Sequence, residues 1–368
     1  MEKYQKKLIL FMPSMDGGGV EKNIVIIGNY LSKHVNNLIL ITFDNKFNRF
    51  FSKKIKIINA QKKSKKKINK YYKYFRCLII LTKEIFKNSH SSVFSFQANI
   101  YSVILSKILN FKLIIRSNSS PTGWTKNFIK NYLFKKFFKS PIAIIVNSIN
   151  FKKEIDKKFD INSTFIYNPL NKKEIINKST EKINKSIYKN KKSLKLISIA
   201  RFTDQKDHMT LLRAFEVINK KITCELLLIG YGVNKAKIQN FISENKLESK
   251  IKILNYQTNP FKFIKKSDMF ILTSKYEGLP NVLLEALTLK KFIISTNCPT
   301  GPKEILKNGK YGFLFNIQNY KQLAKLILKY SKNKKKYKNK ILFGYNSLDR
   351  FDLNTNCKKY YNETLKIL

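Results

Sequence analysis

Short apolar runs alternate with longer amphipathic stretches along most of the chain. The runs have the length of strands, and the stretches between them repeat their apolar positions with helical spacing. This alternation is typical of α/β proteins built on parallel sheets. In the first half the helical spacing is clear at Val20–Ser32 and Asn99–Leu109. The runs there predict strands at Lys7–Pro13, Asn37–Phe43, Lys56–Ala60, Ser92–Gln97, Lys112–Ser117 and Ala143–Ser148.

The alternation stops once and then resumes. It ends at an Asn-Pro turn near Phe165–Pro169, and residues 171–193 are mostly Lys, Asn, Ser and Ile without a clear core face, so they predict a linker or exposed excursion. The pattern therefore predicts two doubly wound, Rossmann-like domains, at 1–170 and 194–345, that face each other across a ligand cleft. A helix within 346–368 is expected to pack back on the first domain. Strands of the second half are predicted at Leu194–Ala200, Glu225–Gly230, Lys250–Leu254, Met269–Ser274, Phe292–Thr296 and Gly312–Phe315.

Composition narrows the class of protein. A hydrophobic content of 43% excludes wholesale disorder, and no apolar run reaches the length of about 18 residues that indicates a membrane span. The four cysteines are far apart and form no CxxC pair. This argues against a disulfide framework or a zinc site and predicts a cytoplasmic protein.

The charge of the chain is extreme. Lys and Arg number 73 against 23 Asp and Glu, which gives a formal net charge of +50. Two explanations stay open: a coding bias toward Lys, Asn, Ile, Phe and Tyr, or attraction to a polyanion such as an anionic membrane or a nucleic acid. Between Asp44 and Glu154 the only acidic residue is Glu84, while lysines crowd residues 53–73. This distribution favours a surface effect on the first half.

A glycine-rich stretch separates the first predicted strand from the first predicted helix. It reads MDGGGVE at residues 15–21. Gly17, Gly18 and Gly19 would let the backbone approach a ligand closely, and the helix N-terminus would offer free amides to an anion. A plain turn is the alternative, because the stretch is neither GxGxxG nor a P-loop.

A second stretch, RFTDQKDH at 201–208, directly follows a predicted strand. Arg201 and Lys206 lie five positions apart at the carboxyl end of that strand, where a forked donor and a point charge could hold a diphosphate from two sides. In so basic a chain the two cations could also be a coincidence. His208 is interpreted as the start of a helix rather than as an acid or base.

The strongest motif is KYEGLPNVLLE at 275–285. Glu277 is predicted to end a strand, Pro280 to occupy the first helical position, and Glu285 to lie about one turn into the helix. Both carboxylates could then face one ligand and accept hydrogen bonds from sugar hydroxyls, while amides at the helix start balance phosphate charge. A capped surface helix is the plainer alternative.

Together these stretches resemble the family-4 retaining glycosyltransferases, which have the two-domain GT-B fold. Glu277 and Glu285 reproduce the Glu-x7-Glu signature, and GGGVE at 17–21, RFTDQKDH at 201–208 and LLLIGYG at 226–232 match other landmarks in order. CPTGPKEIL at 298–306 resembles a stretch of members that act on bacterial surface glycans. The similarity covers nearly the whole chain.

The resemblance implies a role for each matching residue. Arg201 and Lys206 would hold the donor diphosphate and stabilise the leaving nucleotide, Glu285 would bind the ribose, and Glu277 would contact the transferred sugar. The remaining implied donor contacts are Gly17, Gly18, Gly19, Gly278, Leu279, Pro280 and Asn281.

The resemblance further implies a retaining enzyme that needs no cofactor or metal, which agrees with the lack of an Asp-x-Asp sequence. The donor would be a nucleotide-sugar, UDP-linked or GDP-linked, and the acceptor a lipid-linked or lipopolysaccharide-type glycan. The family's first-domain histidine is missing from RSNSSPTGW at 116–124, so Arg116 or Asn118 are candidates to replace it.

Two rival functions are weighed against this reading. A GT-B epimerase would use more histidines and carboxylates in its cleft than this chain offers, since it has only three histidines. A polyanion-binding protein on a degenerate transferase scaffold is disfavoured because Arg201, Lys206, Glu277 and Glu285 are intact. No specific nucleic-acid partner is expected.

A basic segment with large aromatics, Trp124–Lys139, predicts peripheral docking on the inner face of an anionic membrane. Trp124, Phe128, Leu133 and Phe137 trace one helical face, which suits an interfacial helix. The alternative is that these aromatics belong to the core of an ordinary α/β layer. The cations expected to contact lipid are Lys126, Lys130, Lys135, Lys136 and Lys139.

Overall fold

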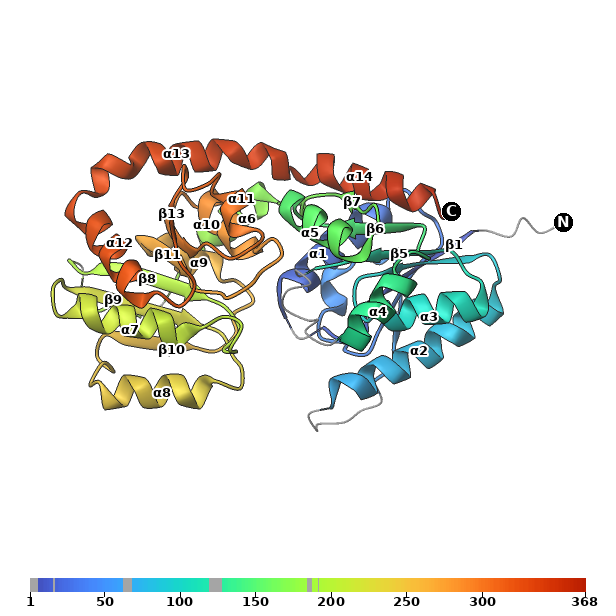
Figure 1. The fold of residues 1–368 in the computed structure, drawn as a ribbon, viewed down its shortest axis with the longest axis horizontal. Helices are drawn as coiled ribbons and strands as arrows, with labels where there is room; N and C mark the ends of the chain where they lie inside the picture. Colours follow the sequence, from blue (N-terminus) through green and yellow to red (C-terminus); the bar gives the residue numbers. More distant parts are fainter. Residues whose placement is uncertain (1–5, 16, 62–67, 119–127, 184–186, 191) are drawn as a thin grey trace. The chain divides into compact units, whose positions relative to one another are not determined.

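A computed structural model describes residues 6–15, 17–61, 68–118, 128–183, 187–190 and 192–368, with the backbone alone at 128–130. The chain divides into two compact units (Figure 1). Unit 1 comprises Met1–Pro169 and Leu353–Leu368, and unit 2 comprises Leu170–Asp352. Each is a doubly wound parallel sheet covered by helices, which confirms the predicted Rossmann-like α/β architecture.

Unit 1 contains a seven-stranded sheet in the order β3-β2-β1-β4-β5-β6-β7. Neighbouring strands in this sheet pair in parallel. Six of the strands lie within the predicted apolar runs or one residue beyond them, and the short β7 was not predicted from the pattern. The strands are β1 (Lys7–Phe11), β2 (Leu38–Thr42), β3 (Lys56–Asn59), β4 (Ser91–Ser95), β5 (Leu113–Arg116), β6 (Ala143–Val146) and β7 (Thr164–Phe165).

Helices cover both faces of this sheet. Side chains of α1 and α14 pack with Leu8 and Leu10 of β1 in one apolar cluster. Side chains of α2 to α5 pack with Ile9 and Phe11 in another. The alternation of buried side chains along β1 therefore supplies both layers. The helices are α1 (Gly19–Leu31), α2 (Lys70–Lys87), α3 (Asn99–Leu109), α4 (Phe128–Phe137), α5 (Ile149–Phe159) and α14 (Leu353–Leu365).

Unit 2 contains a six-stranded parallel sheet in the order β10-β9-β8-β11-β12-β13. One face packs on α7, α8 and α12, and α9 and α10 contact strands of the same sheet. Its strands are β8 (Leu194–Ile199), β9 (Cys224–Ile229), β10 (Ile251–Leu254), β11 (Met269–Leu272), β12 (Phe292–Thr296) and β13 (Phe313–Phe315). Its helices are α6 (Lys172–Ser179), α7 (His208–Asn219), α8 (Lys235–Glu244), α9 (Phe261–Lys266), α10 (Asn281–Thr288), α11 (Pro302–Ile305), α12 (Tyr320–Lys332) and α13 (Lys338–Asn346).

The predicted linker at 171–193 is wrong in part, because it begins with α6. Asn171 caps this helix by accepting the Glu174 N–H, and α6 contacts α9 and α10 of unit 2. Only Ile175 and Ser179 of the helix are buried. A helix that contributes one apolar side chain to a core leaves no periodic pattern in the sequence, so the segment resembled an exposed linker.

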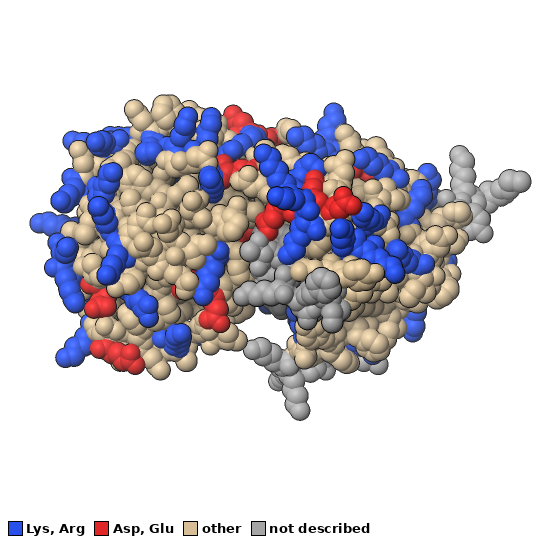
Figure 2. Space-filling model, viewed as in Figure 1, with Lys and Arg blue, Asp and Glu red and all other residues tan. Residues whose placement is uncertain are grey.

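Basic side chains are scattered over the viewed face of both units rather than gathered in a single patch (Figure 2). This spread does not single out the first half of the chain as the cationic part. It suits a compositional bias at least as well as a dedicated polyanion site.

Candidate functional site

The carboxyl ends of the strands in unit 2 bring together one residue from each of the two strongest motifs. Lys206 lies in the loop after β8, and Glu277 lies in the loop between β11 and α10. Lys206 Nζ is 2.5 Å from Glu277 Oε1, and the two side chains are 16% and 8% exposed. Because β8 and β11 are neighbours in the sheet, both loops leave the same edge.

Hydrogen bonds fix these two loops against each other. The Lys275 N–H donates to the Gln205 carbonyl at 2.8 Å, and Gln205 Nε2 donates to the Tyr276 carbonyl at 2.9 Å. Thr273 Oγ1 donates to the Lys206 carbonyl at 2.9 Å. The ion pair therefore rests on a rigid backbone frame, which is what precise placement of a ligand requires.

The two ends of the loop after β8 differ in exposure. Arg201 is exposed, so its guanidinium is accessible to an anion in solvent. His208 is the first residue of α7, as predicted, and its buried ring packs edge-on against Phe202 at 4.9 Å between centroids. Burial, with a smaller effect of nearby Lys206, lowers the pKa of His208 to about 3. His208 is therefore neutral near pH 7 and acts in packing.

Residues 298–306 hold the turn that carries Glu277. The prediction that Glu277 ends a strand is wrong, because β11 ends at Leu272 and Glu277 lies in the following loop. Thr300 Oγ1 donates to the Glu277 carbonyl. Gly301 has φ +82°, and a Cβ there would lie 2.0 Å from the Gly278 carbonyl oxygen, so only glycine fits. The stretch that resembled a surface-glycan motif thus has a structural role beside the site.

Helix α10 begins at Asn281, one residue later than the sequence predicts. Pro280 occupies the N-cap position with extended backbone and provides no side-chain cap. Leu279 is buried beside it, and Glu285 is buried within the helix, with 3% of the residue exposed. The first amides of α10 therefore lie close along the chain to Glu277, at the same edge of the sheet.

The glycine stretch in unit 1 forms the predicted junction between β1 and α1. Gly17 has φ +91°, Gly18 is the N-cap, and Gly19 is the first helical residue. A Cβ at Gly18 would lie 3.0 Å from Glu21 Oε2. The buried Glu21 carboxylate thus lies near the helix N-terminus and balances part of its dipole, a feature that the anion-binding interpretation of this turn did not include.

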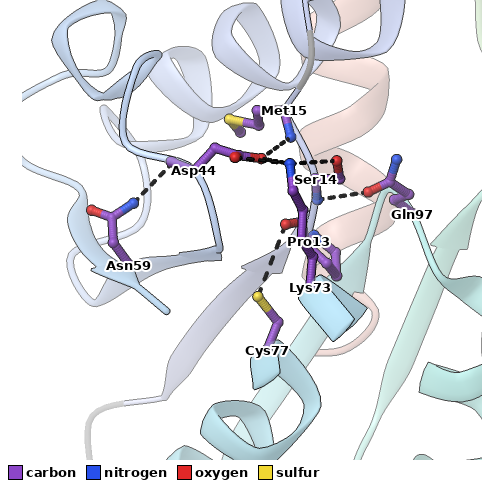
Figure 3. Close-up of polar contacts among 8 residues, drawn as sticks. All are labelled: Pro13, Ser14, Met15, Asp44, Asn59, Lys73, Cys77 and Gln97. Carbon is purple, nitrogen blue, oxygen red and sulfur yellow. Dashed lines mark hydrogen bonds and ion pairs between the residues drawn. The ribbon is translucent and has the colours of Figure 1, made fainter. Parts of the chain in front are cut away.

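Directly before the glycines, a polar network joins three segments of unit 1 (Figure 3). Asp44 follows β2, Lys73 lies on α2, and Gln97 follows β4. Lys73 Nζ is 2.9 Å from Asp44 Oδ1, and both Asp44 and Gln97 accept backbone N–H groups of the segment after β1. Sequence analysis missed these residues. Two signals in the sequence could have pointed to Asp44. It is the last acidic residue before a long basic stretch, and it directly follows a predicted strand.

The Arg116 side chain is hydrogen-bonded within unit 1. Its side chain is fully buried in unit 1, with Nε donating to Tyr360 Oη at 3.0 Å and one terminal nitrogen donating to Asn168 Oδ1 at 2.6 Å. The prediction that Arg116 replaces the family's histidine is not supported by this placement. Asn118 is half-buried, and its Nδ2 donates to the Phe96 carbonyl at 2.9 Å.

The described part of the predicted membrane-docking segment has one face on the unit 1 core and one face in solvent. Phe134 and Phe137 pack against the cluster of buried residues under α2 to α5, so the alternative of core aromatics is correct for them. Leu133 is 41% exposed, and Lys135 and Lys136 are exposed. Outside the described residues or side chains lie Trp124, Lys126, Phe128 and Lys130.

A contiguous exposed apolar stripe lies on α2 instead. Its members, which share the helix face opposite the buried one, are separated by helical spacings along the sequence. Lys83 and Lys87 are exposed on the same helix. The α2 stripe consists of Tyr71 (69% exposed), Tyr72 (50%), Phe75 (62%), Ile79 (37%) and Phe86 (75%).

The described part of the chain shows neither a cluster of metal-ligating side chains nor a membrane-spanning helix. His, Cys, Asp and Glu side chains there nowhere gather in threes as metal ligands would. Across the same ranges, no helix combines the length and apolar character needed to cross a bilayer.

Comparison with known proteins identifies relatives of both the sequence and the fold. Residues 179–346 match the model of the family described as Glycosyl transferases group 1. An uncharacterized glycosyltransferase of Methanocaldococcus jannaschii is 35% identical over 219 residues, which are 55% of this chain and 53% of the relative, so the match spans about half of each.

A Campylobacter jejuni enzyme matches over nearly its full length. It is named N-acetylgalactosamine-N,N'-diacetylbacillosaminyl-diphospho-undecaprenol 4-alpha-N-acetylgalactosaminyltransferase, and it is 25% identical over 96% of this chain and 99% of the relative.

Solved structures share the fold. The Anabaena protein HepE, in complex with UDP and glucose, superposes with a TM-score of 0.77 at 16% identity, covering 99% of this chain and 100% of that one. A glycosyltransferase from Rickettsia africae gives a TM-score of 0.75 at 20% identity, covering 99% of both chains. The two-unit α/β fold, the family match in unit 2 and the full-length relative agree. Residues 179–346 therefore match the group 1 glycosyl transferases, and the chain has the GT-B fold of its solved neighbours.

Proposed function

We propose that this protein is a retaining glycosyltransferase that transfers a sugar from a UDP-sugar to a lipid-linked or polysaccharide acceptor. The observation that carries the proposal is the Lys206–Glu277 ion pair at the carboxyl edge of the unit 2 sheet, close along the chain to the exposed Arg201. The Campylobacter relative, named for a diphospho-undecaprenol substrate, supports the acceptor class. The complex of HepE with UDP and glucose supports the donor class.

The donor diphosphate is assigned to Arg201 and Lys206. A diphosphate would compete with Glu277 for Lys206, so that the carboxylate is released to accept hydrogen bonds from the transferred sugar. Before the donor binds, Glu277 keeps the ammonium group of Lys206 at the edge of the sheet. The Lys206 side chain therefore loses less conformational freedom when the diphosphate binds. The amides of Gly278 to Asn281 would support the phosphate or the sugar, and Glu285 would bind the ribose hydroxyls.

The reaction follows from this charge distribution. The bond between the anomeric carbon and the diphosphate oxygen breaks, and the electron pair stays on the phosphate, where Arg201 and Lys206 stabilise the added charge. The acceptor oxygen bonds to the anomeric carbon on the same face, and its proton passes to the leaving phosphate. Positive side chains and backbone amides would replace a metal ion in this scheme, so we propose that the protein needs no metal or cofactor.

A lipid-linked acceptor suggests a function for the α2 stripe in membrane docking. A lipid-linked acceptor stays in the bilayer, so the enzyme must reach the membrane surface. The α2 stripe would bury aromatic side chains at the interface, and Lys83 and Lys87 on the same helix would contact anionic headgroups. We therefore assign peripheral docking on an anionic membrane to α2, with Lys135 and Lys136 of α4 as further contacts.

A donor screen tests the proposed function. The purified protein is offered UDP-, GDP- and ADP-sugars with and without a lipid-linked glycan acceptor, and released nucleotide is measured. We expect release from a UDP-sugar that depends on the acceptor and persists in EDTA. Release only after addition of Mn²⁺ or Mg²⁺ would contradict the metal-free scheme, and no release from any donor would contradict the transferase assignment.

A further inference from the structure

Two buried ion pairs attach α2 to the unit 1 sheet, one at each edge of the sheet. Lys7, at the start of β1, pairs with Glu84 near the end of α2, with 2.6 Å between Nζ and Oε2. Lys73, near the start of α2, pairs with Asp44 just beyond the end of β2. The Lys7–Glu84 side chains are 7% and 9% exposed, and those of Lys73–Asp44 are 11% and 17% exposed. The two pairs are thus similar in burial and differ in which edge of the sheet they occupy.

The pair at the carboxyl edge also holds backbone. Asp44 Oδ2 accepts the Met15 N–H at 2.9 Å, and Gln97 Oε1 accepts the Ser14 N–H at 2.8 Å. Lys73 Nζ donates to Asp44 Oδ2 at 2.9 Å and lies 3.5 Å from Ser14 Oγ. Figure 3 shows these side chains converging on the segment that follows β1.

The regular strand pairing of β1 ends just before Ser14 and Met15. The backbone pairing of β1 with its neighbours continues as far as the Pro13 carbonyl, which accepts the Phe43 N–H. The next two residues, Ser14 and Met15, are 1% and 0% exposed. Buried amides must be hydrogen-bonded or they destabilise the fold, so side chains from the loops after β2 and β4 replace the missing strand partners.

The neighbouring side chain on α2 strengthens the same attachment. Cys77, one helical turn after Lys73, lies with its Sγ 4.0 Å from the Pro13 carbonyl oxygen. Burial, and then the nearby Asp44 carboxylate, raise the pKa of the Cys77 thiol to about 12. The thiol therefore stays protonated and neutral, and it can donate to the Pro13 carbonyl.

We propose that Asp44 and Lys73 are positioning residues for sugar transfer, because they fix the backbone from which the Gly17–Gly19 turn begins. This inference rests on the proposed function and on the substrate contact that the family resemblance implies for Gly17–Gly19. Asp44 acts through the Met15 amide, and Lys73 acts by holding the Asp44 carboxylate in one orientation. Neither side chain takes part in bond breaking.

The alternative is that the pair only stabilises unit 1, and the second ion pair provides the matched control. Asp44→Asn and Lys73→Met disturb the pair at the glycine turn, while Glu84→Gln disturbs the similarly buried pair at the opposite edge. We expect all three variants to lower the midpoint of thermal unfolding. UDP affinity, a property of the motif residues in unit 2, should stay within about twofold of wild type in all three, which is a small change in free energy.

The decisive readouts concern the turn itself. In Asp44→Asn and Lys73→Met, kcat should fall by up to about 10²-fold, the loss expected when a substrate contact moves by about 1 Å. Lys73→Arg should restore part of the activity because it keeps the charge. Hydrogen exchange of the Gly17–Gly19 amides should accelerate in Asp44→Asn and Lys73→Met. Glu84→Gln should keep the wild-type kcat and the wild-type exchange at the turn.

Each outcome decides the matter. Equal kcat and equal exchange in Asp44→Asn and Glu84→Gln would overturn the positioning role and leave the pair as a stabilising contact. If the wild type transfers no sugar, the proposed function fails, while exchange at the turn still reports whether Asp44 and Lys73 hold it. Accelerated exchange with unchanged kcat would also overturn the positioning role, because the turn would then have no part in transfer.

Discussion

The carboxyl edges of the two sheets each carry a lysine–carboxylate pair, and the two pairs are held differently. In unit 1 the Asp44 carboxylate also accepts a backbone amide, so it is committed to the fold. In unit 2 the Glu277 carboxylate pairs with Lys206, and Arg201 is exposed close along the chain. A pair that also supports backbone is suited to position a loop. A pair whose partners can exchange for a ligand is suited to bind one.

The largest expected effect is at the exchangeable pair. Arg201→Ala and Lys206→Ala should each lower kcat by about 10²-fold, because charge builds on the diphosphate as the bond breaks. Steady-state kinetics with the best donor measures this, and Arg213→Ala on the exposed side of α7 is the control. If Lys206→Ala kept the wild-type kcat, the unit 2 pair would have no role in ligand binding that distinguishes it from the unit 1 pair.

A smaller effect separates binding from chemistry within unit 2. Glu285→Ala should raise the donor KM about tenfold with a lesser change in kcat, since a hydrogen bond to a charged group contributes about 1.5 kcal/mol in ground and transition state alike. Glu216→Ala, on α7, is the control. An unchanged donor KM would contradict the assignment of Glu285 to the ribose.

The two edges also differ in how far the sequence could predict them. In unit 2 the site residues lie in contiguous motifs directly after apolar runs, and the family match covers 179–346. In unit 1 the pair joins residues 29 positions apart that belong to no motif. Strand positions followed from runs of apolar residues, because a buried parallel strand needs apolar side chains on both faces. A long-range polar contact leaves no such local signature.

Errors of the sequence interpretation have the same cause. The aromatics of Trp124–Lys139 fit an interfacial helix and a core helix equally well, and only tertiary packing shows that Phe134 and Phe137 face the core. Arg116 was counted as a candidate ligand because it lies in the stretch from which the family's histidine is missing, and its full burial is unusual for an arginine. Its partner Tyr360 comes from the far end of the chain, which no local pattern reveals.

The difference between α2 and α4 leads to a third prediction, for membrane binding by unit 1. Replacing both Phe75 and Phe86 with serine should lower the affinity for anionic vesicles on the order of tenfold. Two aromatic side chains that are partly buried in the membrane interface contribute a few kcal/mol at most. Phe343→Ser, an exposed aromatic of unit 2, is the control. Co-sedimentation with anionic and neutral vesicles measures it. If the double variant and the control bound anionic vesicles equally well, α2 would not be the docking helix. Docking would then depend on α4 or on no helix of unit 1.

The last effect concerns the stability of unit 2 and its dependence on pH. It is expected to come from His208, at the end of the loop after β8 that carries Lys206. The folded pKa of His208, about 3, lies below its ordinary value of 6.5 because the ring is buried. The unfolded chain therefore takes up a proton first as the pH falls. The stability of unit 2 is unaffected by this group above pH 6.5 and decreases from there toward pH 3, with a limiting slope of about 1.4 kcal/mol per pH unit.

His208→Leu should remove this part of the pH dependence, while His90→Leu, an exposed histidine of unit 1, should leave it in place. The measurement is the free energy of unfolding from urea titrations at pH 7, 6 and 5, followed by hydrogen exchange in α7 so that unit 2 is observed by itself. If the unfolding free energy of His208→Leu kept the wild-type dependence on pH, His208 would not be the group that causes this dependence.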